Sequence, residues 1–267
     1  MSHTRAHLKV RAKSLLIGNG GKAFLLLVIP SCFSMLLRAA GLFTASSGRL
    51  TQLLPGFFSS DGWRYAAPAV LFALALLSLL ILPPLLLGRD AWYWQRSARE
   101  YRPFTYAFSW YRRLGRAVTL YLMRWVVRIA SALLFLAPAL VCTGIALALY
   151  SRGASVYTLA ILGCAAGALW IAGIGFTTLF LQRFFLTPYL IADDPQLRVR
   201  DALRESARIM DACMMRGSTA KMKLSFFPWV ASCIFIFPIL YVYPYYKQSC
   251  ACYARHILNN ERTPKLI

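Results

Sequence analysis

The chain has 267 residues, of which 59% are hydrophobic and only 15% are charged. This composition is too apolar for a soluble domain of that length and predicts an integral membrane protein. The formal net charge of +21 would suggest nucleic-acid binding in a soluble protein. Here the basic residues fall between apolar runs, where they orient membrane segments and attract anionic headgroups. We therefore expect anionic membrane lipids as partners, and no nucleic acid.

The N-terminal residues 1–22 are basic and contain no acid, which predicts a cytoplasmic N-terminus. The glycine-rich stretch Gly18–Lys22 lacks the spacing of a phosphate-binding Walker loop, so we interpret it as a turn. The first predicted span covers about 23–43 and is long enough to cross a bilayer. A cleaved signal peptide is the alternative, but the basic region is long and further spans follow.

A second span is predicted at about 65–87, followed by a basic loop at 88–116. The loop carries seven arginines against two acids, so we expect it to be cytoplasmic. Tryptophan and tyrosine residues are interleaved with these arginines. That mixture can bind single-stranded nucleic acid. Beside a membrane it is more typical of an interfacial aromatic belt on short amphipathic helices, which we favour.

The third and fourth spans are predicted at about 118–150 and 156–181. Arg124 and Arg128 are four residues apart and share a helix face near the cytoplasmic interface. They either extend toward the headgroups by snorkelling or bind a lipid phosphate or another anion, and both interpretations stay open. In the fourth span, Gly163 and Gly167 have the spacing of residues that let membrane helices approach closely.

A second cytoplasmic loop, 182–223, contains an amphipathic helix predicted at 195–216. Asp194-Pro195 is a helix-start signal, and Leu203, Ala207, Met210 and Met214 form one apolar face. Between two membrane segments such a helix is expected in the interface, with a solvated connector as the alternative. Arg204 and Arg208 can lie at the same depth as Arg124 and Arg128, and Glu205 can pair with Arg208 on one turn.

The last apolar region, 224–258, is too long for one span and short for two. Phe237-Pro238 and Pro244 predict two short segments, at 224–237 and 239–257, although a single span stays possible. The sequence therefore predicts an all-α fold: a polytopic membrane helical bundle of five or six segments with interfacial amphipathic helices. The whole chain, 1–267, is expected to form a single integral membrane domain.

Several motifs stand out along the chain: Ala192-Asp193-Asp194-Pro195, the run Ala202–Ser206 leading to Met210, Leu224-Ser225-Phe226 with Trp229, Tyr243-Pro244-Tyr245, the basic Gly18–Lys22 turn, and the loop Gly88–Arg116 with Phe108. Together they resemble an uncharacterised bacterial family of multipass membrane proteins, called domain of unknown function 975. The resemblance covers most of the chain. It implies a helical membrane fold in the bacterial inner membrane and carries no catalytic residue.

The residue inventory gives little support for catalysis. Every acidic residue falls outside the predicted spans, and Cys250-x-Cys252 has no companion cluster that would make a metal site. We predict no catalytic residue, metal or cofactor, and no enzymatic activity.

Three hypotheses remain. The first is a membrane scaffold or accessory protein that binds anionic lipid or a membrane protein partner through its basic cytoplasmic face. The second is a transporter or transport accessory, and the third and remotest is an enzyme acting on phospholipid headgroups. The candidate lipid contacts are Arg124, Arg128, Arg204 and Arg208.

Overall fold

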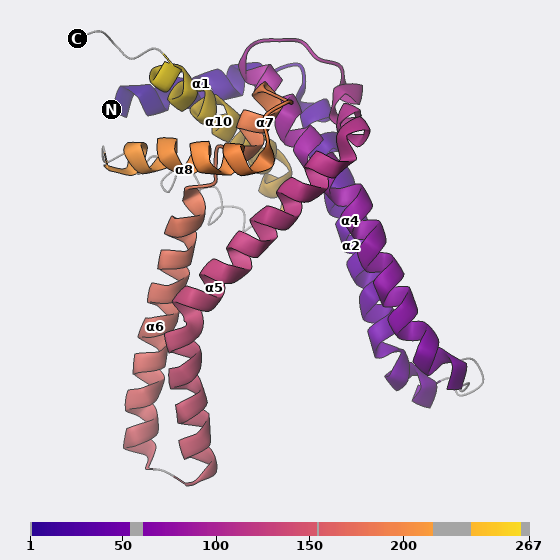
Figure 1. Ribbon diagram of the computed structural model, residues 1–267, viewed down its shortest axis with the longest axis vertical. Helices are drawn as coiled ribbons and strands as arrows, with labels where there is room; N and C mark the ends of the chain where they lie inside the picture. Colours follow the sequence, from indigo (N-terminus) through magenta and orange to yellow (C-terminus); the bar gives the residue numbers. More distant parts are fainter. Residues whose placement is uncertain (1, 54–60, 154, 216–235, 263–267) are drawn as a thin grey trace. The chain divides into compact units, whose positions relative to one another are not determined.

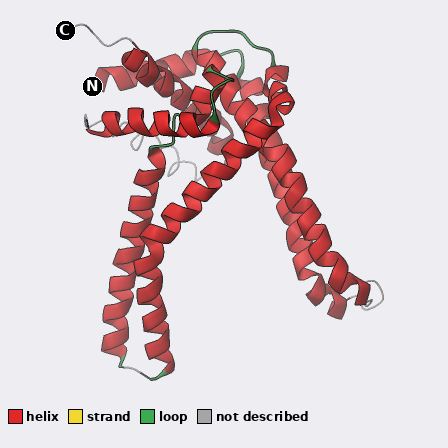
Figure 2. Ribbon diagram, in the orientation of Figure 1, coloured by secondary structure: helices red, strands yellow, loops and turns green. Residues whose placement is uncertain are grey.

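The computed structural model describes residues 2–53, 61–153, 155–215 and 236–262. These ranges are helical, joined by turns, and no strand occurs in them (Figure 2). The all-α prediction is confirmed. The chain divides into two compact units, which are described separately: unit 1 is Met1–Val118, Pro188–Leu197 and Gly217–Ile267, and unit 2 is Thr119–Thr187 and Arg198–Arg216.

Four helical stretches of the described residues are long and apolar enough to cross a membrane. They are Gly20–Leu42, Pro68–Ser97, Phe104–Ser151 and Val156–Asp193, and they contain most of the first four predicted spans. Only 6% of the most apolar window of the third stretch is buried. In water so large an apolar surface would drive association, whereas lipid tails cover it without cost. Length, composition and exposure together are those of a membrane-embedded protein.

In unit 1, α2 (Gly20–Leu53) and α4 (Asp61–Ser97) run side by side (Figure 1). The preceding helix α1 (Ser2–Leu16) is joined to α2 through Gly18, whose φ of 78° is left-handed and favours glycine. The predicted turn in this stretch is thus confirmed. The hydroxyl of Tyr93 donates a hydrogen bond to the Ala23 carbonyl at 3.0 Å, which holds the start of α2 against the end of α4.

Helix α4 is longer than its predicted span. The sequence prediction placed residues 88–116 in a loop, whereas α4 continues through Pro83-Pro84 to Ser97. Each proline lacks a backbone N–H and weakens the helix locally. The side chains of Ala91–Trp94 are buried, so packing supports the helix beyond the prolines. The rest of the predicted loop contains a 3-10 helix, η1 (Phe104–Arg113), which packs on α4.

Helix α10 (Ile236–Arg262) packs on α1, α2 and α4. It runs through Pro244 without a break, and the predicted boundary at Phe237-Pro238 falls in its first turn. Contacts with three other helices stabilise α10 there, although Pro244 removes one backbone hydrogen bond. The predicted segment 239–257 is part of this longer helix. Most of the predicted segment 224–237 lies outside the described residues.

In unit 2, α5 (Leu114–Ser151, in unit 2 from Thr119) and α6 (Val156–Gln182) form a hairpin (Figure 1). Its turn uses Gly153 with a φ of 75°. The Ser155 side chain caps α6 by accepting a hydrogen bond from the Thr158 backbone N–H at 3.3 Å. Further along, the Trp170 indole donates to the Thr143 hydroxyl at 3.2 Å, which links the two helices through polar groups.

The close approach between α5 and α6 occurs at Gly173. A Cβ there would lie 2.6 Å from the Phe135 carbonyl oxygen, so only glycine fits. The Phe135 ring also stacks on Phe176 with ring centres 6.0 Å apart. Gly163 and Gly167 lie on the same helix, but a Cβ at either would meet no atom within 4 Å. Their predicted role in packing stays a prediction and would need a partner other than α5.

The segment after α6 differs from the prediction at one point. The short helix α7 (Thr187–Asp193) is followed by a turn, and α8 (Val199–Met215) begins four residues later than predicted. The Asp194 carboxylate accepts a hydrogen bond from the Gln196 backbone N–H at 2.8 Å, so it stabilises the turn rather than capping α8.

Helix α8 buries one of its faces. Its buried face comprises Val199, Ala202, Leu203, Ser206, Ile209 and Met210, which includes two of the four predicted apolar positions. Within unit 2, the Ser206 hydroxyl donates to the Arg183 carbonyl at 2.7 Å. The Arg183 side chain in turn pairs with Asp211 at 2.7 Å. These contacts attach α8 to the end of α6.

We predict that replacing Gly173 by leucine destabilises the α5–α6 hairpin by about 1–3 kcal/mol or more, because the new side chain forces the helices apart. Thermal unfolding of the purified protein in detergent measures the effect. Gly163→Leu is the matched control and should leave the hairpin intact. If Gly163→Leu instead reduces assembly in native membranes, the predicted packing role of that glycine lies with another partner. Equal stability of Gly173→Leu and the wild type would contradict the close contact.

Candidate functional site

One end of unit 1 gathers cations and aromatic rings from separate parts of the chain. The Lys22 amino group donates to the Tyr101 hydroxyl at 2.9 Å, and the Arg96 guanidinium lies 5.7 Å from the centre of the same ring. The hydrogen bond and charge of Lys22 lower the pKa of the Tyr101 hydroxyl. The start of α2 and the end of α4 therefore meet at one cationic end of the helix pair.

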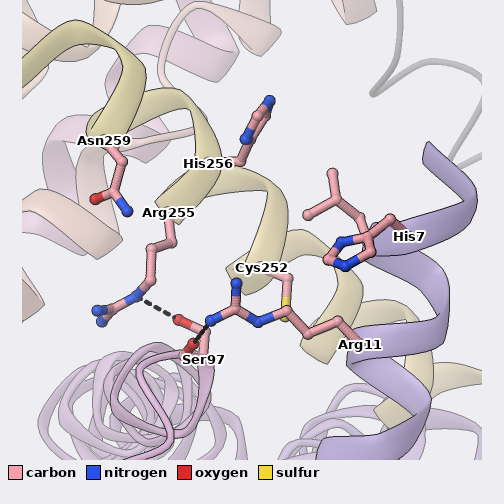
Figure 3. Close-up of a pocket in the computed structure, with 8 residues that line it drawn as sticks. His7, Arg11, Ser97, Cys252, Arg255, His256 and Asn259 are labelled. Atoms are coloured by element: carbon pink, nitrogen blue, oxygen red, sulfur yellow. Dashed lines mark hydrogen bonds between the residues drawn. The ribbon is translucent and has the colours of Figure 1, made fainter. Parts of the chain in front are cut away.

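A pocket of about 610 Å³ opens at this end between α1, the last turn of α4, and α10 (Figure 3). We call it the α1–α10 pocket. It is lined by His7, Leu8, Arg11, Ser97, Cys252, Arg255, His256 and Asn259. This lining contains two guanidinium groups and two imidazole rings but no carboxylate, which is the composition expected of a site for an anion.

Both arginines of the pocket reach Ser97 from different helices (Figure 3). Arg11 Nη2 donates to the Ser97 carbonyl at 3.2 Å. Arg255 Nε donates to the Ser97 hydroxyl at 2.8 Å, and its Nη2 donates to the Trp94 carbonyl at 3.1 Å. The last carbonyls of a helix lack partners within it and carry partial negative charge. The two arginines therefore cap α4, and the capping holds their side chains in place.

The charge of the pocket stays positive despite this capping. The helix dipole is equivalent to about half a negative charge at the end of α4, against two full positive charges. Asp193 and Glu100 are the acids whose negative charges stabilise the positive charge of Arg255. Glu100 pairs with Arg102 at 3.5 Å, and Asp193 accepts a hydrogen bond from the Trp94 indole at 3.2 Å. Both acids thus have other partners and neither lines the pocket.

A second basic hollow of about 440 Å³ lies where η1 meets α5. Its lining includes Arg112, Arg113 and Arg116, which we call the arginine ledge, together with Gln196. Arg116 donates to the Gln196 side-chain oxygen at 3.1 Å. Arg112 and Arg113 are exposed and Arg116 is half-buried, so the first two charges face the surroundings of the protein.

The position of η1 relates the ledge to the apolar stretch of α4. The Tyr111 hydroxyl donates to the Ile81 carbonyl at 3.0 Å. Gly88 lies against the Ala107 backbone so closely that a Cβ there would overlap it. The 3-10 helix therefore runs alongside the end of the apolar part of α4, where an embedded helix meets the headgroup region.

A third cluster of charges is buried between α4 and α10. Arg89 and Asp90 are each only 7% exposed. Asp90 Oδ1 lies 3.1 Å from Arg89 Nη2 and 3.3 Å from Lys247 Nζ. Asp90 lies within the candidate span Pro68–Ser97, so the prediction that every acid falls outside the membrane segments is corrected. The predicted span ended before Asp90, and only the longer helix brings the carboxylate inside.

The predicted lipid contacts lie elsewhere, in unit 2. Arg124 and Arg128 are one turn apart on α5, as expected, and Arg204 and Arg208 are exposed on α8. The predicted pairing is confirmed, because Arg208 Nη2 lies 2.6 Å from Glu205 Oε1 and lowers the pKa of that carboxyl. None of the four arginines lines the α1–α10 pocket or the ledge. Their binding of an anionic lipid stays a prediction.

The sequence carried no local signal for the α1–α10 pocket. Arg11 and Ser97 are 86 positions apart, and Ser97 and Arg255 are 158 apart. Each pocket arginine looks like any other basic residue flanking a membrane segment. In the described residues, no group of three or more His, Cys, Asp or Glu side chains is placed to hold a metal ion.

We predict that Asp90→Asn lowers the stability of the protein by about 3–5 kcal/mol, because it leaves the buried Arg89 and the half-buried Lys247 without their carboxylate. Thermal unfolding in detergent measures the loss. Glu100→Gln is the control, since it breaks an exposed ion pair worth less than about 1 kcal/mol. Equal stability of the two variants would mean that the buried cluster is solvated.

Of three comparisons with known proteins, the one with family models agrees with the sequence resemblance. No curated protein and no solved structure matches the chain. The model of one family, described as "Protein of unknown function (DUF975)", matches residues 1–261. Because the match covers nearly the whole chain, the protein belongs to this family.

Proposed function

We propose that this protein is a non-enzymatic membrane protein that binds anionic lipid through a basic face. The observation that carries the proposal is the arginine ledge. Three arginines and one glutamine line an open hollow beside the end of the apolar part of α4. That is the depth at which lipid phosphates lie, and each basic residue near an anionic surface contributes about 1 kcal/mol. Such a protein acts as a scaffold or accessory for membrane partners.

The proposal includes an arrangement in the bacterial cytoplasmic membrane. The four apolar helices cross it. Residues 224–257 contribute either a fifth segment or both a fifth and a sixth. The charge pattern supports a cytoplasmic N-terminus, because the basic N-terminal region and the basic residues within 88–116 flank the same ends of the first two spans. In unit 1 the hydrogen bond from Lys22 to Tyr101 agrees with a common side for these two segments.

The ledge is tested by Arg112→Gln/Arg113→Gln. We expect about a tenfold or greater loss of anionic lipid that co-purifies with the protein, because two interfacial charges are removed. Native mass spectrometry of protein extracted in mild detergent measures the bound lipid. The matched control is Lys9→Gln/Lys13→Gln, which removes two charges from exposed positions on α1 outside both hollows. The same loss in both variants, or in neither, would contradict a specific role of the ledge.

The topology is tested with single cysteines in a background from which the native cysteines have been removed. Cysteines at positions 96 and 208 are expected to react with an impermeant thiol reagent from the cytoplasmic side. A cysteine at position 152 is expected to react only from the outer side. Labelling of positions 96 and 208 from opposite sides would overturn the proposed arrangement.

One observation favours a transport role as the second candidate. The buried cluster of Arg89, Asp90 and Lys247 places a carboxylate within a candidate span. Ionisable groups at such positions often mark ion or substrate pathways. Uptake into proteoliposomes of purified protein, compared with the Asp90→Asn variant, separates the two candidates. Solute flux that depends on Asp90 would favour transport over a scaffold.

A further inference from the structure

The two arginines of the α1–α10 pocket have unused capacity for hydrogen bonding. A guanidinium carries five N–H donors. Arg11 uses one of them on Ser97, and Arg255 uses two on Ser97 and Trp94. Arg11 Nε is buried, and no described residue accepts its hydrogen. An unpaired buried donor is unfavourable, so an acceptor that entered the pocket and let the guanidinium turn toward it would be stabilised.

The placement of these donors on different helices restricts the shape of the anion. Arg11 belongs to α1 and Arg255 to α10, and Figure 3 shows both side chains converging on Ser97. A planar carboxylate pairs best with one guanidinium at a time. A tetrahedral group with three free oxygens can accept from both sides at once. Its third oxygen then remains available to the other polar groups of the lining.

We propose that the α1–α10 pocket binds a phosphomonoester group, which is a terminal phosphate on either a soluble molecule or a lipid headgroup. Arg11 and Arg255 hold the phosphate oxygens, and His7, His256 and Asn259 surround it. The pocket volume of about 610 Å³ leaves room for the glycerol or sugar that carries the phosphate. The site shares no lining residue with the arginine ledge, so it does not depend on lipid binding there.

Capping of α4 alone does not account for the composition of the pocket. One arginine already provides bonds to both Ser97 and Trp94, and its guanidinium lies 4.3 Å from the centre of the Trp94 ring. The second arginine and the two histidines add positive or ionisable groups around the same hollow, while no acid lines it. The two arginine charges repel one another, and an anion between them removes that repulsion.

The test is equilibrium binding of radiolabelled inorganic phosphate to the full-length protein, purified in a non-ionic detergent. We expect saturable binding that Arg11→Gln weakens by about tenfold or more, the effect of losing a charge-assisted hydrogen bond. Lys13→Gln removes the same charge from an exposed position of α1 outside the pocket and should bind as the wild type does. His7→Gln is a second variant in case Arg11→Gln does not fold. His7 is exposed on α1 and lines the pocket, so its replacement should also weaken phosphate binding.

Three results would overturn the proposal: no saturable binding by the wild type, unchanged binding by both Arg11→Gln and His7→Gln, or an equal loss in Lys13→Gln.

Competition with nanodiscs distinguishes the sources of the phosphate. Displacement of labelled phosphate by phosphatidic acid but not by phosphatidylglycerol identifies a lipid headgroup, and no displacement by either identifies a soluble ligand. Equal displacement by phosphatidylglycerol, a diester, would refute the monoester. Arg112→Gln/Arg113→Gln should bind phosphate normally, which separates this test from that of the ledge.

Discussion

Compensation of buried charge in the last turns of α4 is the constraint on which unit 1 depends. Asp90 is nearly inaccessible and accepts contacts from Arg89 on its own helix and from Lys247 on α10. A buried ion without its partner is strongly unfavourable, so α10 must remain against α4. The same turns end in carbonyls that Arg11 and Arg255 cap. The end of α4 therefore joins segments from both ends of the chain.

The change from apolar to polar surroundings occurs over a short length of the same helix. From Pro68 to Leu82 the α4 side chains are mostly apolar and mostly exposed, whereas from Pro83 to Trp94 most side chains are buried. The absence of a side chain at Gly88 allows η1 to lie directly on α4. The arginines of η1 and early α5 are consequently presented beside the apolar stretch. This arrangement supports the proposed binding of headgroup phosphates.

Two kinds of basic site follow from this arrangement, and they differ physically. The arginine ledge is open, so its charges are screened by salt and attract any anionic surface. The α1–α10 pocket is more enclosed, and its arginines are held by hydrogen bonds to Ser97. Preorganised donors lose little side-chain entropy on binding and discriminate by geometry. Attraction to a bilayer and recognition of a particular group can therefore reside at different places in one unit.

The sequence by itself determined the helical class, the first four apolar segments and the pairing of Glu205 with Arg208. All of these depend on residues close together in the chain, through apolar length and helical periodicity. Only the tertiary structure decided that α4 continues past Pro83-Pro84, that Gly173 is the close contact of α6, and that His7, Arg11, Ser97 and Arg255 meet. Each of these outcomes depends on packing between segments remote in the chain. A proline, a glycine or an arginine looks the same in a sequence whether or not another helix lies against it.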